Sequence, residues 1–269
     1  MASRTKQKEE ARARRLAEEQ ARAERARRQR RMQMVGGIVV GAVIVVVALV
    51  LISSGGGGAA KETGLQSGTK ANATASAVDQ MFAGISQGGN RLGKPNAPVT
   101  MTYYGDYECP VCQAFTLQGG FPQLVANDVR TGKVKVVYRS FCTATCGGPG
   151  ESVFNTQQVA GLAAGRQNLF WQFTELFYRE QGQEDTGYVN ESYLDGLAQQ
   201  IPGLNLSAWK TARNDPNLTA QVASDQNSAK QIGVSGTPTL IFSGPKGQAA
   251  ASQAVPTYAQ LESVIKQVS

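Results

Sequence analysis

The chain has 269 residues, which is enough for one large domain with appendages and for a sizeable hydrophobic core. It contains no histidine, and this excludes Ser-His-Asp and Cys-His catalysis and metalloproteases with histidine ligands. The formal net charge of +7 would suit a nucleic-acid-binding protein, but residues 1–31 hold 12 Lys and Arg against five Glu, which accounts for the whole excess. The remaining chain is neutral, so the composition favours a charged flank over a nucleic-acid surface.

The N-terminal part of the sequence predicts a membrane anchor. Residues 1–33 form a basic tail of strong helix formers, and residues 34–53 carry no charge and are rich in Val, Ile, Leu, Gly and Ala. At about 1.5 Å per residue, a helix of this length spans a bilayer core of roughly 30 Å. The positive-inside rule then predicts a cytoplasmic N-terminus and an extracytoplasmic remainder. A cleaved signal peptide is the alternative, although the charged region is unusually long for one. Residues 54–80, rich in Gly, Ser, Ala and Thr, predict a flexible linker.

A strand followed by two cysteines is the first strong signal in the remainder. The β-branched and aromatic residues of 99–104 predict a buried strand, which leads into the sequence Cys-Pro-Val-Cys. At the start of a helix, unpaired N–H groups and the helix dipole stabilise a thiolate, so we expect a lowered pKa for Cys109. Pro110 suits a first helical turn, and Cys112 lies one turn later, where it can resolve a mixed disulfide.

A second cysteine pair, Cys142 and Cys146, follows a strand predicted at residues 134–141. Four cysteines can form a zinc site, but this spacing is longer than in a usual zinc ribbon. The second pair can instead close a small structural loop, which is worth about 2 kcal/mol at most. It can also exchange electrons with Cys109 and Cys112. Neither residue of the second pair begins an evident helix, which favours the structural disulfide.

Two stretches resemble the signatures of the DsbA-like thiol:disulfide oxidoreductases, a family with the thioredoxin fold. Residues 106–112 resemble the active-site motif of the family, and residues 233–242 resemble its cis-proline loop. The resemblance covers residues 82–269. It implies an α/β thioredoxin fold over 81–269 with an α-helical domain inserted at about 151–232, preceded here by the single transmembrane helix.

The pattern of the insertion agrees with this expectation. Residues between the strand at 134–141 and a strand predicted at 239–242 have helical periodicity, and Tyr258, Leu261 and Ile265 predict a final amphipathic helix. A set of large apolar side chains at helical spacing indicates a core packing face, with a peptide-binding face as the alternative. The set is Phe170, Trp171, Phe173, Leu176 and Phe177.

The resemblance also implies roles for individual residues. Cys109 is expected to form the mixed disulfide with a substrate protein, and Cys112 to resolve it. Pro238 is expected to follow a cis peptide bond and to keep metals away from the cysteines. The backbone of Thr237 is expected to pair with bound peptide. Cys142 and Cys146 remain a structural or an exchanging pair.

The sequence departs from the family at two positions. Val111 stands between the active-site cysteines where the best-known members have a histidine, so imidazole does not stabilise the thiolate here. Nearby Asp106 and Glu108 oppose a thiolate, which predicts a milder oxidant than the histidine-containing members. Tyr103 replaces the carboxylate that serves thioredoxins as a proton acceptor. Asp106 is a candidate proton relay in its place.

These observations predict an extracytoplasmic oxidoreductase, attached to the cell membrane by a single span, that introduces disulfides into reduced secreted or envelope proteins. The resemblance implies reoxidation by a quinone-linked membrane partner of the DsbB or vitamin K epoxide reductase type. It implies no dissociable cofactor or metal, because the cysteine pair is the redox centre. The neutral charge of residues 32–269 argues against a nucleic-acid partner. A disulfide reductase or isomerase of the same fold is the alternative within this chemistry. A redox-inert binding or zinc-holding module is the alternative outside it.

Overall fold

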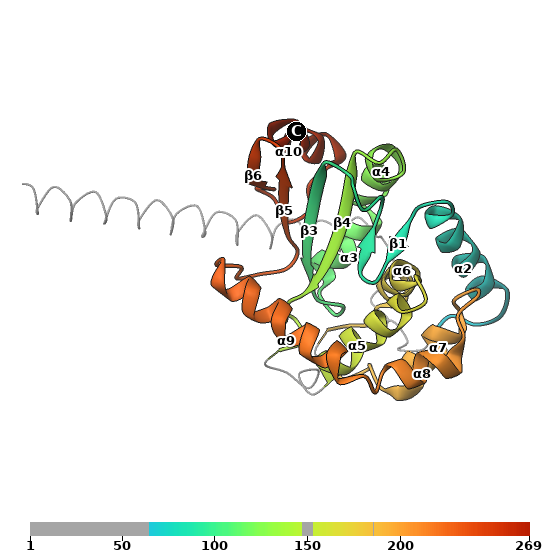
Figure 1. Ribbon diagram of the computed structural model, residues 1–269. Helices are drawn as coiled ribbons and strands as arrows, with labels where there is room; N and C mark the ends of the chain where they lie inside the picture. The colour runs from blue at the N-terminus through green and yellow to red at the C-terminus, as the bar shows by residue number, and fades with distance from the viewer. Residues whose placement is uncertain (1–64, 147–152, 185) are drawn as a thin grey trace, which may run out of the picture. The chain divides into compact units, whose positions relative to one another are not determined.

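The computed structural model describes residues 65–146, 153–184 and 186–269 (Figure 1). The basic tail and the anchor predicted at residues 1–33 and 34–53 lie outside these residues, as does the first part of the predicted linker. Across the described ranges, no helix combines the length and the apolar character needed to cross a bilayer.

A six-stranded mixed sheet forms the centre of the described domain. Its strands are β1 (Gln87–Gly88), β2 (Arg91–Leu92), β3 (Val99–Gly105), β4 (Val134–Ser140), β5 (Thr239–Gly244) and β6 (Gly247–Ala250). Their order across the sheet is β1-β2-β4-β3-β5-β6. The central strands β3 and β4 are parallel, and the other neighbouring pairs are antiparallel. The strands predicted at 99–104, 134–141 and 239–242 are therefore confirmed.

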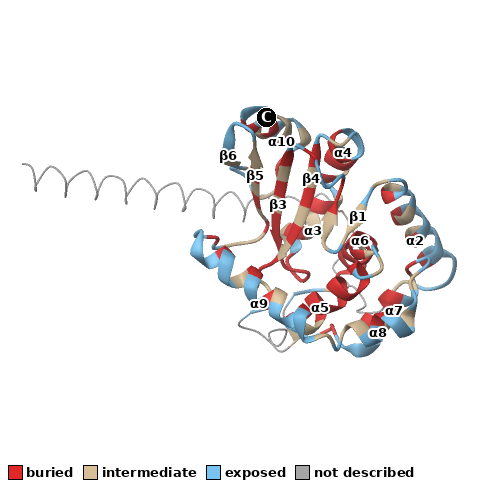
Figure 2. Ribbon diagram, in the orientation of Figure 1, coloured by how far each residue is buried: buried red, intermediate tan, exposed pale blue. Residues whose placement is uncertain are grey.

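The main core lies on the face of the sheet where alternate residues of β3 and β4 are buried, and Figure 2 shows these strands largely in the colour of buried residues. Three helical segments follow β3: α3 (Pro110–Leu117), α4 (Phe121–Leu124) and the π-helical turn η1 (Val125–Val129). The C-terminal helix is α10 (Tyr258–Val268). Tyr103 of β3 is fully buried and meets the ring of Phe115 in α3 edge to face, at 5.3 Å between centroids. Tyr138 of β4 meets Phe170 at the same separation of 5.3 Å. These aromatic contacts fix α3 and the inserted helices against the strands that precede the two cysteine pairs.

The predicted helical insertion is present between β4 and β5. It consists of α5 (Phe154–Gly165), α6 (Phe170–Glu180), α7 (Glu191–Gln199), α8 (Leu206–Ala212) and α9 (Pro216–Gln231). The large apolar residues singled out on α6 are at most 1% exposed, so they form core and not a peptide-binding surface. The helix α9 covers part of the opposite face of the sheet, where Asp225 pairs with Arg139 at 2.6 Å.

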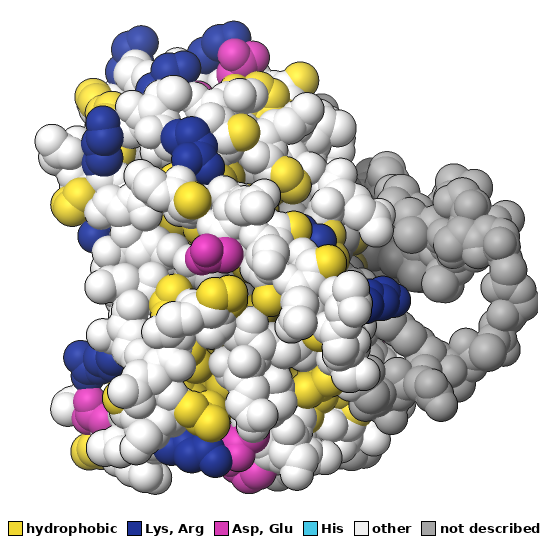
Figure 3. All heavy atoms as spheres, turned by 90° about the vertical axis from the view of Figure 1, so that its right-hand side faces the viewer, with side chains coloured by type: hydrophobic (Ala, Val, Ile, Leu, Met, Phe, Trp, Pro, Cys, Tyr) yellow, Lys and Arg dark blue, Asp and Glu magenta, His cyan; other side chains and the backbone are white. Residues whose placement is uncertain are grey.

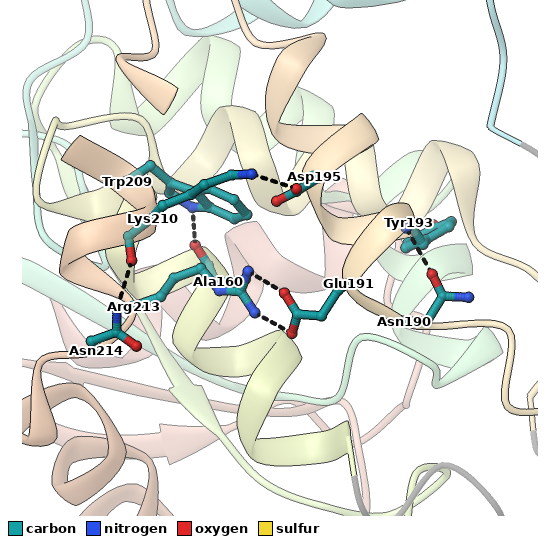
Figure 4. A network of polar contacts seen from close by, with 9 residues as sticks. All are labelled: Ala160, Asn190, Glu191, Tyr193, Asp195, Trp209, Lys210, Arg213 and Asn214. Atoms are coloured by element: carbon teal, nitrogen blue, oxygen red, sulfur yellow. Dashed lines mark hydrogen bonds and ion pairs between the residues drawn. The ribbon is translucent and has the colours of Figure 1, made fainter. Parts of the chain in front are cut away.

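Polar contacts join the helices of the insertion to one another (Figure 4). Arg213 donates two hydrogen bonds of 2.7 Å to Glu191, which lowers the pKa of that carboxyl. The guanidinium also lies over the ring of Trp209, at 4.8 Å. The indole N–H of Trp209 donates to the carbonyl of Ala160, at 2.9 Å. Together these contacts link α7, α8 and α5.

The linker predicted at residues 54–80 is wrong in its second half. Residues 68–82 form the helix α2 (Gly68–Phe82), which packs against α6. Ala71, Ala75, Val78 and Phe82 are buried and recur at the spacing of one helix face. Small alanines between Ser, Thr and Asn conceal this stripe in the sequence, and its burial against α6 supplies the stability that the composition alone lacks.

The charged side chains of the described domain are dispersed on the face shown in Figure 3. Basic, acidic and apolar groups lie there as separate small clusters between uncharged polar residues. This distribution agrees with the balanced charge of residues 32–269.

Candidate active site

The two cysteines of the Cys-Pro-Val-Cys sequence lie where β3 passes into α3. Cys109 is the N-cap residue of α3, and Pro110 occupies the first helical turn as predicted. The N–H of Cys112 donates to the Sγ of Cys109 at 3.4 Å, so the sulfur takes the place of an ordinary capping oxygen. Cys109 is 5% exposed, whereas Cys112 is fully buried. Both are free thiols, and Val111 between them is half-buried.

The surroundings of the two thiols separate their acidities. The pKa of Cys109 is lowered, first by its side-chain hydrogen bond with Cys112 and then by contacts with Thr237 and the N–H of Cys112, against the opposing effects of burial and of Asp106. The pKa of Cys112 is raised well above its usual value by burial and by the hydrogen bond and charge of Cys109. Cys109 therefore ionises first, and Cys112 holds its proton.

The cis-proline loop lies beside Cys109. The Thr237–Pro238 peptide bond is cis, as expected. The thiol of Cys109 donates to the carbonyl oxygen of Thr237 at 3.4 Å, although the two residues are 128 positions apart in the sequence. Pro238 is buried and Thr237 is half-buried. The fold thus brings the two stretches of the resemblance together, and the binding of peptide by Thr237 stays a prediction.

The second cysteine pair forms a disulfide in the loop after β4. Cys142 and Cys146 are joined with a Cα–Cα distance of 5.7 Å. Thr143, between them, shares a hydrogen bond with Thr237 through their hydroxyl groups. No pattern in the sequence predicts this contact, which makes the disulfide loop a neighbour of the candidate active site.

The candidate proton relay Asp106 is fully buried, and its carboxylate is turned toward the disulfide loop. It accepts the backbone N–H groups of Thr143 at 2.8 Å and Thr145 at 3.0 Å, and also the hydroxyl of Thr145. A fourth hydrogen bond comes from the N–H of Glu108 at 3.1 Å. These contacts give the carboxylate a structural function, and proton transfer by Asp106 stays a prediction.

A group of buried tyrosines lies beneath Cys112. The hydroxyl of Tyr103 lies 3.1 Å from the hydroxyl of Thr116 and 3.4 Å from the carbonyl oxygen of Cys112. It also donates to the hydroxyl of Tyr178, which donates in turn to the carbonyl of Asp106 at 3.3 Å. Burial raises the pKa of Tyr103 well above its usual value, so this residue stays neutral and does not serve as the carboxylate base of thioredoxins.

Residues of the insertion also hold the active-site turn. The side-chain amide of Gln181, just after α6, donates to the carbonyl oxygens of Tyr107 at 2.6 Å and Cys109 at 3.1 Å. Gln113 donates to the carbonyl of Tyr178 at 2.6 Å. Sequence reasoning missed both glutamines, because no local motif marks a side chain whose partner lies about 70 positions away.

Comparison with known proteins agrees with this geometry. A family model described as Thioredoxin matches residues 86–267. The chain belongs to this family. Among curated proteins, it is 24% identical over 173 residues to the "Probable disulfide bond formation protein D" of Bacillus anthracis, covering 62% of this chain and 74% of that protein. It is 27% identical over 154 residues to the "Disulfide bond formation protein D" of Bacillus subtilis, covering 55% and 65%.

Solved structures place the fold among DsbA-like proteins. Oxidised BdbD from Bacillus subtilis has a TM-score of 0.56 and 22% identity, covering 66% of this chain and 91% of that one. DsbA from Chlamydia trachomatis has a TM-score of 0.54 and 20% identity, covering 66% and 90%. The resemblance to DsbA-like thioredoxin-fold oxidoreductases is thus confirmed at the level of family and fold.

Proposed function

We propose that the chain is a thiol:disulfide oxidoreductase that introduces disulfides into secreted or envelope proteins through Cys109 and Cys112. The observation that carries this proposal is the pairing of two adjacent thiols of opposite acidity beside a cis-proline loop. The pKa of Cys109 is lowered by hydrogen bonds, and that of Cys112 is raised by burial. The names of the curated relatives point to the same chemistry.

The proposed reaction starts from the oxidised Cys109–Cys112 pair. A substrate thiolate attacks the Sγ of Cys109, the S–S bond breaks, and its electron pair leaves on the sulfur of Cys112, which takes up a proton because its pKa is high. A second substrate thiolate then attacks the substrate sulfur bound to Cys109. Cys109 leaves as a thiolate, the substrate holds a new disulfide, and the pair has gained two electrons.

The acidity of Cys109 favours this direction. A stabilised thiolate stabilises the reduced protein and makes Cys109 a good leaving group, so the disulfide form is an oxidant. The buried carboxylate of Asp106 opposes that thiolate, and Val111 provides no imidazole. Both features make the Cys109 thiolate less stable than a thiolate beside a histidine. They therefore support an oxidant that is milder than the histidine-containing members of the family.

The cellular setting belongs to the same proposal. Residues 34–53 would anchor the chain in the cell membrane with the catalytic domain outside the cytoplasm, where protein thiols meet oxidising conditions. A quinone-linked membrane protein of the DsbB or vitamin K epoxide reductase type would accept the two electrons.

The disulfide between Cys142 and Cys146 leaves a four-cysteine zinc site without two of its thiolates, which counts against the zinc-holding alternative.

The redox state of Cys109 and Cys112 in intact cells tests the direction. Acid trapping followed by alkylation with a maleimide of high mass should show the pair mostly oxidised. A mostly reduced pair would contradict the oxidase and favour the reductase or isomerase. In vitro, the oxidised chain should restore activity to a reduced, denatured disulfide protein, and it should reduce insulin poorly.

A further inference from the structure

Asp106 is a buried charge whose stability must come from hydrogen bonds and not from a cation. Its side chain is fully buried beside a cysteine that functions as an anion, and none of the ion pairs of the described residues includes it. A buried carboxylate without a cation is costly unless hydrogen bonds replace its water. This position also disfavours the Cys109 thiolate, so the carboxylate must contribute something that outweighs both costs.

The contacts of the carboxylate join two segments that are far apart in the sequence. One hydrogen bond, from the N–H of Glu108, lies within the turn that leads to Cys109. The other three come from Thr143 and Thr145 in the disulfide loop, across more than 35 positions of the sequence. The N–H donors at 2.8 and 3.0 Å are backbone groups, so Asp106 fixes the path of the loop itself.

The disulfide loop in turn holds the cis-proline loop. The hydroxyl of Thr143 is bonded to the hydroxyl of Thr237, and the carbonyl oxygen of Thr237 accepts the thiol of Cys109. The contacts therefore close a ring from Asp106 through Thr143 and Thr237 to Cys109 and back along the chain to Asp106. A shift of the disulfide loop would move the carbonyl that lies at the reactive sulfur.

We propose that Asp106 is a positioning residue of the exchange reaction. It docks the loop of Cys142–Cys146 so that Thr143 holds the cis-proline loop in the position that receives an extended protein substrate. This inference rests on the proposed function and adds that Cys109 and Asp106 serve different parts of the reaction. Reaction of Cys109 with a small dithiol requires the sulfur alone, whereas reaction with a polypeptide also requires the loop that Asp106 sets.

The test compares two substrates of the same oxidised chain. In Asp106→Asn, only one accepting oxygen remains, so whichever way the amide is turned, the N–H groups of Thr143 and Thr145 or the N–H of Glu108 face an N–H₂ group in place of an acceptor. The rate of oxidation of a reduced, unfolded protein, divided by the rate with dithiothreitol, should fall about tenfold or more because a small misplacement of a binding group is costly. The pKa of Cys109, measured by alkylation, should fall in the same variant because a negative charge is removed.

Two variants keep this test decisive. Thr143→Val retains the backbone N–H bonded to Asp106 and removes the hydroxyl bonded to Thr237, so the same ratio should fall while the pKa of Cys109 moves less than in Asp106→Asn. Asp195→Asn alters a carboxylate of α7 that pairs with Lys210, and its ratio should equal that of the parent chain. If Asp106→Asn does not fold, the ratio of the two rates measured for Thr143→Val tests the proposal by itself.

The outcomes separate this inference from others. Equal loss of both substrates in Asp106→Asn would overturn it in favour of proton transfer to or from Cys112. A substrate ratio in Thr143→Val equal to that of the parent chain would also overturn it. Failure of the parent chain to oxidise even dithiothreitol would refute the proposed function itself, before the variants are compared.

Discussion

Two cysteine-containing turns leave the same edge of the sheet and differ in chemistry. The strands β3 and β4 are parallel and end side by side at Gly105 and Ser140. The turn after β3 enters α3, where Cys112 donates its N–H to the sulfur of Cys109. The turn after β4 is instead closed by its own disulfide. The sulfur at the helix N-terminus is the acidic one, because its side-chain hydrogen bond with Cys112, and then its contacts with Thr237 and the N–H of Cys112, lower its pKa.

The largest expected difference between the two turns concerns turnover. Cys109→Ser should abolish oxidation of both protein and dithiothreitol, because it removes the attacked sulfur. In Cys112→Ser, the Cys109 thiolate should attack a disulfide of an oxidised substrate protein, release one substrate thiolate and stay in a mixed disulfide that Cys112 can no longer resolve, visible by mass spectrometry of the acid-quenched reaction. The double variant Cys142→Ser/Cys146→Ser should still oxidise dithiothreitol. Loss of that activity in a folded double variant would show that the second pair exchanges electrons.

The helix behind the first turn should add a pH dependence of stability. Glu175 of α6 is buried beside Arg179, and burial raises its pKa to about 7. A raised pKa gives stability that is complete below the unfolded value and is lost as the pH rises through about 7. The shift corresponds to a loss of about 3 kcal/mol.

The variant Glu175→Gln should therefore lose less stability than the parent chain on going from about pH 5 to about pH 8, as measured by urea unfolding. The active-site cysteines must be kept reduced throughout, so that their own titration is common to both proteins. Parallel stability profiles for the two proteins would show that Glu175 is already ionised in the folded state.

The first turn also depends on close packing against α5. Gly161 faces the hydroxyl of Tyr107, and a Cβ at this position would lie inside the van der Waals distance of that oxygen. Alanine is the better helix former by about 1 kcal/mol, but overpacking costs about 1–3 kcal/mol. We expect Gly161→Ala to lower the free energy of unfolding and to slow turnover.

A matched control for this substitution is Gly196→Ala in α7, where a Cβ would meet only the flexible side chain of Leu65. The control should unfold at the same or a higher urea concentration than the parent chain. A stable, fully active Gly161→Ala variant would mean that Tyr107 moves without affecting the turn.

The smallest effect is expected at the second turn. Because its disulfide closes a short loop, Cys142→Ser/Cys146→Ser should lower the free energy of unfolding by about 2 kcal/mol at most. Urea unfolding under oxidising conditions measures this loss. A much larger loss would show that the bond holds more than its own loop.

Local patterns in the sequence predicted the central strands, the helical insertion and the position of Cys109 and Cys112 at the start of a helix. Strand composition and the start of a helix are local properties, so Cys109 could be identified from its neighbours. The contacts of Asp106 with Thr143, and of Thr143 with Thr237, join residues far apart in the chain, and no short motif encodes them. The helix α2 was missed for a related reason, since its alanines form a core face only when α6 is present.

The opposite acidities of Cys109 and Cys112 are tested most directly by the pH dependence of alkylation of the reduced protein. Iodoacetamide at varied pH, followed by peptide mapping, reports the thiolate of each cysteine separately. Cys109 should react first, with a midpoint clearly below the usual cysteine pKa of about 8.5, and Cys112 should stay protected. A midpoint at or above that value, or earlier modification of Cys112, would contradict these opposite acidities.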